Sequence, residues 1–406
     1  MNHLPLNPLR HPTRLHLSLA CAAAIATLVA CGGGGSAAAD DAKTAYAAGP
    51  ITGFGSVIVN GVRFDDSRAR VLDDDGSSRR ADELRLGMMA EVRSSAITTD
   101  STGSRSDASE IRIGSEVVGP VASIAVDGSS LVVLGLTVKL TSTTLFDDRL
   151  VGGIKALVAG TTVIEVHATF DPATGTYTAT RVEPKANAPF FKVRGTLANL
   201  DAVARTFRIG SGIDTISYDA VRAAVPAALA NGQLVRVRLQ TTKVAGNWVA
   251  ASVVTGAPKI ENHDEAELEG TVTASTFAVD RHFSVNGVAV DATNATFPKG
   301  TAGIVLGARV EVKGSAVSGV VIATRVATED ANKREVEGFE LHGALTELNA
   351  AAKTFMLRGV KVSFASVAEY RKGSVANLVN GRKVEVKGAR SSDGTQLVAT
   401  RIGFED

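Results

Sequence analysis

The sequence is poor in cysteine, and its two cysteines, Cys21 and Cys31, both lie in the N-terminal apolar stretch. A disulfide framework therefore cannot form in the body of the chain, whose stability must come from packed cores and strand pairing. Aromatic residues are also scarce, at 5% of the 406 residues, and Trp248 is the sole tryptophan. This scarcity argues against a surface that stacks nucleic-acid bases or sugars.

An excess of charge of one sign is missing as well. Lysine and arginine total 43, against 42 aspartates and glutamates. Such a balance produces no field that would gather nucleic acid, so we expect no nucleic-acid partner. After residue 30 every apolar run is interrupted before it reaches the roughly 20 residues that a membrane-spanning helix needs. The 45% of apolar residues is nevertheless enough to build packed cores.

Sequence-local catalytic signatures are absent. There is no zinc-protease helix motif, paired Cys-x-x-Cys, phosphate loop, Gly-x-Ser-x-Gly elbow or complete calcium loop. The histidines after the apolar stretch are scattered along the chain, and we predict that each is an exposed strand or linker residue; they are His167, His263, His282 and His342. We therefore expect no catalytic residue, no metal site and no cofactor.

A run of three acids, Asp73, Asp74 and Asp75, precedes Gly76. Carboxylates could hold a divalent cation, but this run lacks the alternate ligand positions and the terminal glutamate of a calcium loop. We predict a solvated turn.

The N-terminus has the pattern of an export signal. Arg10 and Arg14 precede an apolar segment at residues 17–30, which is long enough for a signal-peptide core and too short to span a bilayer. We therefore predict a signal peptide at residues 1–30. An ordinary secretory signal and a short apolar anchor are the alternatives.

The end of that segment, Leu28-Val29-Ala30-Cys31, resembles the lipobox of bacterial lipoproteins. The resemblance implies that Cys31 becomes the first mature residue and carries diacylglycerol and a further acyl chain, so that the lipid bilayer is a partner. More than one chain makes such anchoring durable. Gly32 is not the aspartate that marks inner-membrane retention, which favours the outer membrane by analogy. Residues 31–48 are small and polar and are predicted to be a flexible tether.

Five copies of one pattern follow. A Gly-x-apolar start recurs at offsets of 70, 76, 75 and 73 residues. Each copy then has a glycine between two β-rich runs, a glycine followed by an alternating run, and a closing β-rich run. We place the copies at residues 49–114, 115–184, 190–256, 265–328 and 335–404, and call them copies one to five.

The pattern within a copy is that of β structure. In copy four, apolar Val310 and Val312 alternate with polar Arg309 and Glu311, as in a half-buried strand. Asn60-Gly61 and Asn286-Gly287 lie between β-rich runs, and such pairs tolerate the positive φ angles of tight hairpin turns. Each copy should contain a hairpin.

A short helix or loop is expected between the third and fourth strands. In copy five, Ser366 and Glu369 form a candidate capping box. In copy three, Val221, Val225 and Leu229 would share one helical face, although Pro226 weakens that interpretation.

Three strands, a short helix or loop and two strands in about 70 residues is the order of an OB-like barrel, whose closure leaves few strand edges exposed. We therefore predict an all-β chain of about five small OB-like five-stranded β-barrels; SH3-like barrels and open five-stranded sheets are the alternatives. Polar linkers at residues 184–189, 257–267 and 327–335 suggest separate beads. Only Ser115 and Glu116 separate copies one and two, which suggests rigid docking of that pair.

Copy one opens with Gly49-Pro-Ile-Thr-Gly-Phe-Gly-Ser-Val-Ile-Val-Asn-Gly-Val-Arg-Phe-Asp65. This segment resembles the start of the domain of unknown function 5666 family, which occurs in proteobacterial lipoproteins. Copy one matches best, copies four and five match fairly well, and copies two and three match by pattern only. Because that family has no established activity, the resemblance implies location and fold but no chemistry.

One segment of copy one is a candidate ligand-binding surface. Gly53 and Gly55 would let a backbone approach a partner, and Phe54 between them could be an exposed stacking face. The alternative interpretation is a β-bulge with a core phenylalanine.

Together these features predict a non-catalytic, membrane-anchored envelope lipoprotein whose barrels bind or space an envelope protein or a glycan. Repetition favours binding, since several weak sites on one tether gain avidity. An envelope enzyme with a site in an inter-domain cleft is one alternative, which clustered carboxylates or histidines from two copies would support. An OB-type oligonucleotide or oligosaccharide binder is the other.

Overall fold

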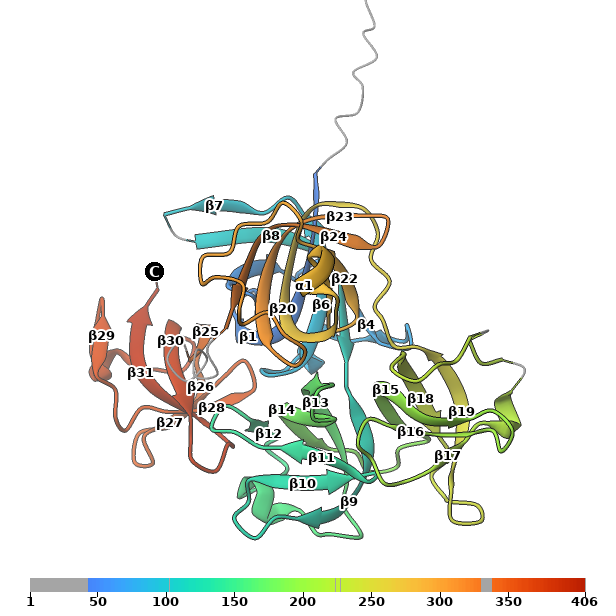
Figure 1. The fold of residues 1–406 in the computed structure, drawn as a ribbon. Coiled ribbons are helices and arrows are strands. Elements are labelled where there is room, and N and C mark those ends of the chain that lie inside the picture. Colours follow the sequence, from blue (N-terminus) through green and yellow to red (C-terminus); the bar gives the residue numbers. More distant parts are fainter. Residues whose placement is uncertain (1–42, 102, 223, 227, 330–337, 406) are drawn as a thin grey trace, which may run out of the picture. The chain divides into compact units, whose positions relative to one another are not determined.

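The computed structural model describes residues 43–405 except residues 102, 223, 227 and 330–337 (Figure 1). The predicted signal peptide, Cys31 and the predicted tether up to residue 42 lie outside the described residues. No helix in the described part is long and apolar enough to cross a membrane. Strands dominate every copy, so the predicted all-β class is confirmed.

Copy one is a closed five-stranded barrel. Its elements are β1 (Thr44–Phe54), β2 (Val57–Val59), β3 (Val62–Asp65), β4 (Arg70–Asp73), β5 (Ser78–Arg79), η1 (Ala81–Glu83), β6 (Met89–Ser95), β7 (Thr98–Asp100) and β8 (Gly103–Gly114). The antiparallel pairs are β1–β2, β2–β3, β6–β8 and β1–β6, and β3 runs parallel to β8. The first strand thus pairs with both the second and the fourth and closes the barrel.

Copies two and three repeat this connectivity. Copy two consists of β9 (Val117–Ile124), β10 (Ser130–Val133), β11 (Leu136–Lys139), β12 (Leu145–Phe146), η2 (Gly153–Ala156), β13 (Val163–Asp171) and β14 (Thr176–Pro184). Copy three consists of β15 (Phe191–Asp201), β16 (Thr206–Ile209), β17 (Ile216–Ser217), η3 (Asp219–Val221), β18 (Leu234–Leu239) and β19 (Trp248–Thr255). The parallel pairs that correspond to β3–β8 are β11–β14 and β17–β19.

Copies four and five have the same strand connectivity. Copy four consists of β20 (His263–Ser275), α1 (Phe277–Asp280), β21 (His282–Val285), β22 (Val288–Asp291), β23 (Arg309–Val317) and β24 (Val320–Thr328). Copy five consists of β25 (Phe339–Ala344), β26 (Thr346–Asn349), β27 (Thr354–Leu357), β28 (Val360–Ser363), β29 (Glu369–Arg371), η4 (Val375–Asn377), β30 (Lys383–Arg390) and β31 (Leu397–Phe404). Their corresponding parallel pairs are β22–β24 and β28–β31.

All five copies therefore close in the strand order 1-2-3-5-4-1 with the third and fifth strands parallel, which is the OB-type order. The closure excludes an open sheet, and the parallel pair separates these barrels from the SH3-like alternative. Local chemistry explains the elements. Asn60 and Gly61 have φ angles of 54° and 78°, and Asn286 and Gly287 have 48° and 86°, as the predicted hairpin turns require.

The predicted helices are wrong in detail. Between the third and fourth strands the chain forms short 3₁₀ turns, η1 to η4, instead of α-helices. In copy five, Glu369 begins β29 because its backbone pairs with β31, and the side-chain capping box is made by Ser374 and Asn377 instead of Ser366 and Glu369. The only α-helix in the described residues, α1, lies between the first two strands of copy four.

The predicted helical face of copy three does not appear in the described residues of that segment, which leave out 223 and 227. Among them only Asp219–Val221 forms a helical turn. Val221, Val225 and Leu229 are partly buried and pack against the core of copies two and three without forming a regular stripe.

The barrels are not separate beads. The first strand of copy one runs parallel to the first strand of copy four, with residues 45–48 paired to residues 265–268. Its other end runs parallel to β25 of copy five, and β9 of copy two is antiparallel to β15 of copy three. Residues 44–48, predicted as the end of the tether, are therefore strand, because their backbone pairs with β6 on one edge and β20 on the other.

The apolar cores also extend across neighbouring barrels. One cluster joins copies one and five, including Val92 and Leu341, and a second joins copies two and three, including Val166 and Val237. The third fills copy four and includes the fully buried Tyr46 of copy one. Each barrel thus shares apolar contacts with a neighbour, and the described residues belong to one compact unit, Ala42–Asp406.

Candidate functional site

The predicted ligand-binding segment of copy one is an internal contact. Phe54 is 6% exposed and packs in the core, so it is not an exposed stacking face. A register shift between Ile51 and Gly53 marks the alternative β-bulge. A Cβ atom at Gly53 would collide with the carbonyl oxygen of Glu340, and one at Gly55, whose φ is 145°, would collide with His342. The partner that these glycines admit is therefore strand β25 of copy five.

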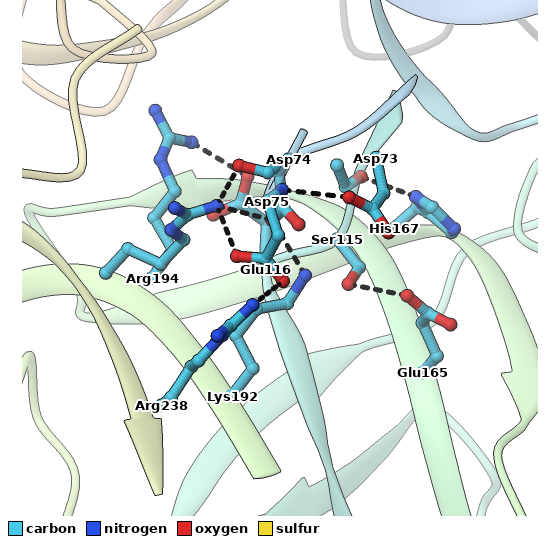
Figure 2. A network of polar contacts seen from close by, with 12 residues as sticks. Asp73, Asp74, Asp75, Ser115, Glu116, Glu165, His167, Lys192, Arg194 and Arg238 are labelled. Atoms are coloured by element: carbon cyan, nitrogen blue, oxygen red, sulfur yellow. Dashed lines mark hydrogen bonds and ion pairs between the residues drawn. The ribbon is translucent and has the colours of Figure 1, made fainter. Parts of the chain in front are cut away.

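Acidic and basic side chains from copies one, two and three instead meet at one place, which we call the charged junction. Figure 2 shows these side chains directed toward one another. Its members are Asp73, Asp74, Asp75, Ser115, Glu116, Glu165, His167, Lys192, Arg194, Arg236 and Arg238.

The basic side chains come from two neighbouring strands of copy three. Lys192 lies directly opposite Arg238, and Arg194 directly opposite Arg236, across the β15–β18 pair. Like charges in such positions repel each other and destabilise a sheet. Four cations on one sheet face therefore require acids from outside the sheet.

Copy one supplies acids for Lys192, Arg236 and Arg238 from the turn after β4, whereas Arg194 pairs with Glu116 at the start of copy two. Asp73 fixes the turn by accepting hydrogen bonds from the backbone nitrogens of Asp75 and Ser77. Asp74 accepts a bond of 2.8 Å from Nζ of Lys192, and Asp75 pairs with Arg238. The Asp74 side chain is 20% exposed, so the predicted solvated turn is wrong: the turn faces copy three.

Asp74 is held in its ionised form. Burial by itself raises the pKa of Asp74, but the adjacent Lys192 and Arg236 together lower it below its ordinary value. The pair with Lys192 is thus ionic at neutral pH.

Copy two contributes a second set of buried polar groups. The Ser115 hydroxyl donates a bond of 2.8 Å to Oε1 of Glu165, and Nζ of Lys185 donates one of 2.6 Å to Oε2. Burial by itself raises the pKa of Glu165, but His167, Lys185 and Lys192 lower it to about 2. Glu165 is therefore also ionised.

His167 is 2% exposed, and its Nδ1 lies 2.6 Å from the carbonyl oxygen of Gly114. Burial lowers the pKa of His167, against the opposing effect of Glu165. The prediction of exposed histidines is wrong for this residue, for His263 at 8% and for His342, whose side chain is 13% exposed. It is correct for His282, whose side chain is 48% exposed.

A comparison with protein families adds the identity of the repeat. The model for "Domain of unknown function (DUF5666)" matches residues 118–183, 269–327 and 342–403, just under half of the chain. Three segments of the chain are thus similar to the DUF5666 domain. The matched segments fall in copies two, four and five, whereas copy one, whose opening carries the resemblance noted above, is not among them. A search of the curated proteins found no match.

The DUF5666 match identifies the kind of repeat and assigns no chemistry. A cleft of about 610 Å³ beside the junction brings together carboxylates and a histidine of two copies, Asp75, Glu165 and His167. However, the carboxylates are paired with cations, and the Ser115 hydroxyl donates to Glu165 while Nδ1 of His167 faces a backbone carbonyl. This arrangement is not that of a nucleophile activated by a neighbouring base.

Within the described residues, two groups of side chains have the composition of a metal site. Oxygen and nitrogen atoms of Glu340, His342 and Glu385 lie within 4.8 Å of one another, as do those of Asp73, Asp74 and Asp75. In both groups, basic side chains already pair with the carboxylates. Nζ of Lys387 lies 2.9 Å from Glu340, and Lys192, Arg236 and Arg238 hold the aspartates. A metal ion would have to displace these cations.

One feature of the sequence indicates the charged junction. The polar face of the run 235–239 carries only arginine, and the start of copy three adds Lys192 and Arg194. So basic a sheet face calls for an acidic partner, although the sequence does not say which acids provide it.

Proposed function

We propose that this protein is a non-catalytic binding or scaffold protein of the cell envelope, anchored in the membrane through acylated Cys31. The observation that carries the non-catalytic role is the use of the ionisable groups at the charged junction, where the acids of copy one neutralise the bases of copy three. Groups engaged in this way hold barrels together and are poorly suited to transfer protons at neutral pH. The lipobox-like sequence before Cys31 supports the anchor.

The scaffold role follows from how the barrels are joined. Because β1 pairs with β20 and β25, and β9 pairs with β15, neighbouring barrels are joined by backbone hydrogen bonds as well as by the chain between them. An envelope protein or glycan that contacts more than one barrel would gain avidity without any flexible element having to be ordered.

Metabolic labelling tests the anchor. Cells producing the full chain are grown with radiolabelled palmitate, and the chain is isolated from membrane and soluble fractions. We expect label and membrane association in the wild type and in Cys21→Ala, which is the matched control, and loss of both in Cys31→Ala. Label that persists in Cys31→Ala, or is lost in Cys21→Ala, would refute anchoring at Cys31.

The enzyme alternative is favoured by one observation, the cleft that joins Asp75, Glu165 and His167. Glu165→Gln removes the charge of a largely buried acid of this cleft and separates the two functions. If the protein is non-catalytic, Glu165→Gln expressed in a deletion strain should restore the wild-type phenotype, provided that the variant folds and is anchored. A folded, anchored variant that fails to complement would favour catalysis in the cleft.

A further inference from the structure

A second cavity adjoins the charged junction, at the place where copies one, three and four meet. Its volume is about 390 Å³, within the range of small-molecule sites. It is lined by β6 of copy one, by Glu116 and Arg194, by the connection at residues 255–259, and by the β21–β22 turn of copy four. We call it the amine cavity.

The arginines that line the amine cavity are already engaged. Arg194 donates from Nε to the Gly256 carbonyl (2.5 Å), from Nη1 to Glu116 (2.8 Å) and from Nη2 to the Asn286 carbonyl (2.6 Å). Arg93 and Arg112 each lie 3.1 Å from Oε1 of Glu110, outside the lining.

The other two basic residues of the lining add little free positive charge. Arg236 pairs with Asp74 and Asp75, and Lys259 is an exposed residue of the lining. The cavity therefore offers a buried ligand little unused positive charge.

Unused hydrogen-bonding capacity lies with a buried acceptor. Glu116 is 7% exposed and lines the cavity. Its Oε1 is bound by Arg194, but its Oε2 has no hydrogen-bond partner among the described residues. A buried acceptor without a donor destabilises the protein, and more so when it is charged, so this atom points to a ligand that donates.

A second acid faces the same space. Glu91 lines the cavity beside the buried hydroxyl of Tyr46, and no ion pair joins it to a basic side chain of the described residues. Burial raises the pKa of Glu91 above its ordinary value, although Arg194 opposes the shift. A cation placed beside Glu91 would stabilise its ionised form.

The rest of the wall is largely apolar. Met89, Pro258, Leu268, Val285 and Val288 contribute to it. Such a wall suits the hydrocarbon part of a ligand. The other two acids of the lining, Asp74 and Glu269, are paired with Lys192 and Arg309, so a bare metal ion would have to displace these cations to gain further carboxylate ligands.

We propose that the amine cavity binds a small organic amine, whose ammonium group donates to Oε2 of Glu116 and to Glu91 while its apolar part packs against the aliphatic wall. This inference goes beyond the envelope role and does not depend on the anchor.

Three probes with the same ring and different head groups test the charge preference. The purified full-length chain is titrated with 2-phenylethylamine, 2-phenylethanol and 3-phenylpropionate, with saturation-transfer NMR and isothermal titration calorimetry as readouts. We expect the amine to bind, the alcohol to bind at least tenfold more weakly and the carboxylate not to bind. A carboxylate that binds as well as the amine, or an amine that does not bind, would overturn the proposal.

Variants locate the binding. Glu116→Gln should weaken amine binding about tenfold or more, since hydrogen bonds to charged groups contribute about 1.5–3 kcal/mol. Because this change also weakens the pair with Arg194, Ala257→Phe provides an independent test: it fills the cavity and leaves both acids in place. Glu369→Gln, an exposed residue of copy five outside the cavity, is the matched control and should bind like the wild type. If Ala257→Phe binds the amine with unchanged affinity, the site is elsewhere.

Discussion

The Nζ atom of Lys192 in copy three donates a hydrogen bond of 2.8 Å to the carboxylate of Asp74 in copy one, 118 positions earlier in the sequence. The two side chains are only 11% and 20% exposed, so water and salt screen this pair weakly. A shielded ion pair between two barrels is expected to matter for stability more than a surface pair does.

Lys192→Met should therefore destabilise the protein. It leaves a largely buried carboxylate with Arg236 at 3.4 Å as its remaining partner, and breaking a buried pair in this way costs about 3 kcal/mol. Urea unfolding of the full chain measures the change. The double variant with Asp74→Asn should recover part of the loss, because it removes the uncompensated charge. A loss below about 1 kcal/mol would mean that the pair behaves like a surface pair.

Acid should weaken the charged junction through Glu165. The pKa of Glu165 is about 2 in the folded chain, below its ordinary value of 4.5, so the unfolded chain takes up this proton first as the pH falls. The associated stability is fully present above pH 4.5 and is lost as the pH falls from 4.5 toward 2, roughly 3 kcal/mol in all.

Unfolding midpoints at several pH values between 7 and 3 check this expectation. Glu165→Gln should be less stable than the wild type at pH 7 and should lose less stability on acidification. Glu347→Gln changes an exposed glutamate and should keep the wild-type slope. Parallel curves for the wild type and Glu165→Gln would contradict the assignment.

The contact between copies one and five should respond to pH in the opposite direction. Burial by itself lowers the pKa of His342, but hydrogen bonds with Glu340 and Glu405 raise it above its ordinary value, against the repulsion of Arg63. A raised folded pKa means that stability is present below the unfolded pKa of about 6.5 and is lost as the pH rises through the folded value.

Thermal unfolding between pH 6 and 9 measures this effect. His342→Gln should flatten the decline, since the titrating imidazolium is gone, while Glu385 and Lys387 nearby remain. His282→Gln replaces a half-exposed histidine and serves as the control. An unchanged slope in His342→Gln would assign the pH dependence to other groups.

Binding to single-stranded nucleic acid is not expected. The charges are balanced, and Phe190, at 43%, is the only aromatic residue among the exposed large hydrophobic side chains of the described part. The full chain should flow through a column of immobilised single-stranded DNA at low salt. Retention that decreases with added salt would support the oligonucleotide alternative.

The fold could be predicted from the sequence because its causes are local. Alternating residues such as Val310 and Val312 define half-buried strands, and Asn60-Gly61 defines a hairpin, so that five repeats of these signals give five barrels. The contacts between barrels could not be predicted in the same way. Ala45 and Ala47 look like tether residues, yet both are fully buried, because their small side chains let two barrels share a strand pair.

The candidate site escaped prediction for a related reason. Asp73 to Asp75 have the local sequence of a solvated turn, and nothing near them indicates that Lys192 and Arg238 will lie opposite. The burial of Phe54 could not be predicted for the same reason, since the sequence of a β-bulge does not determine whether its aromatic ring is buried or exposed. In both cases the deciding partner lies in another copy.

The central claim is that pairing between first strands joins copies one, four and five, and likewise copies two and three, and hydrogen–deuterium exchange of the full chain tests it most directly. If residues 45–48 pair with β6 and β20, peptides covering them and residues 265–268 should be protected from exchange far longer than an unstructured chain. Exchange of residues 45–48 at the rate of an unstructured peptide would show a tether leading to separate beads, and would contradict the account.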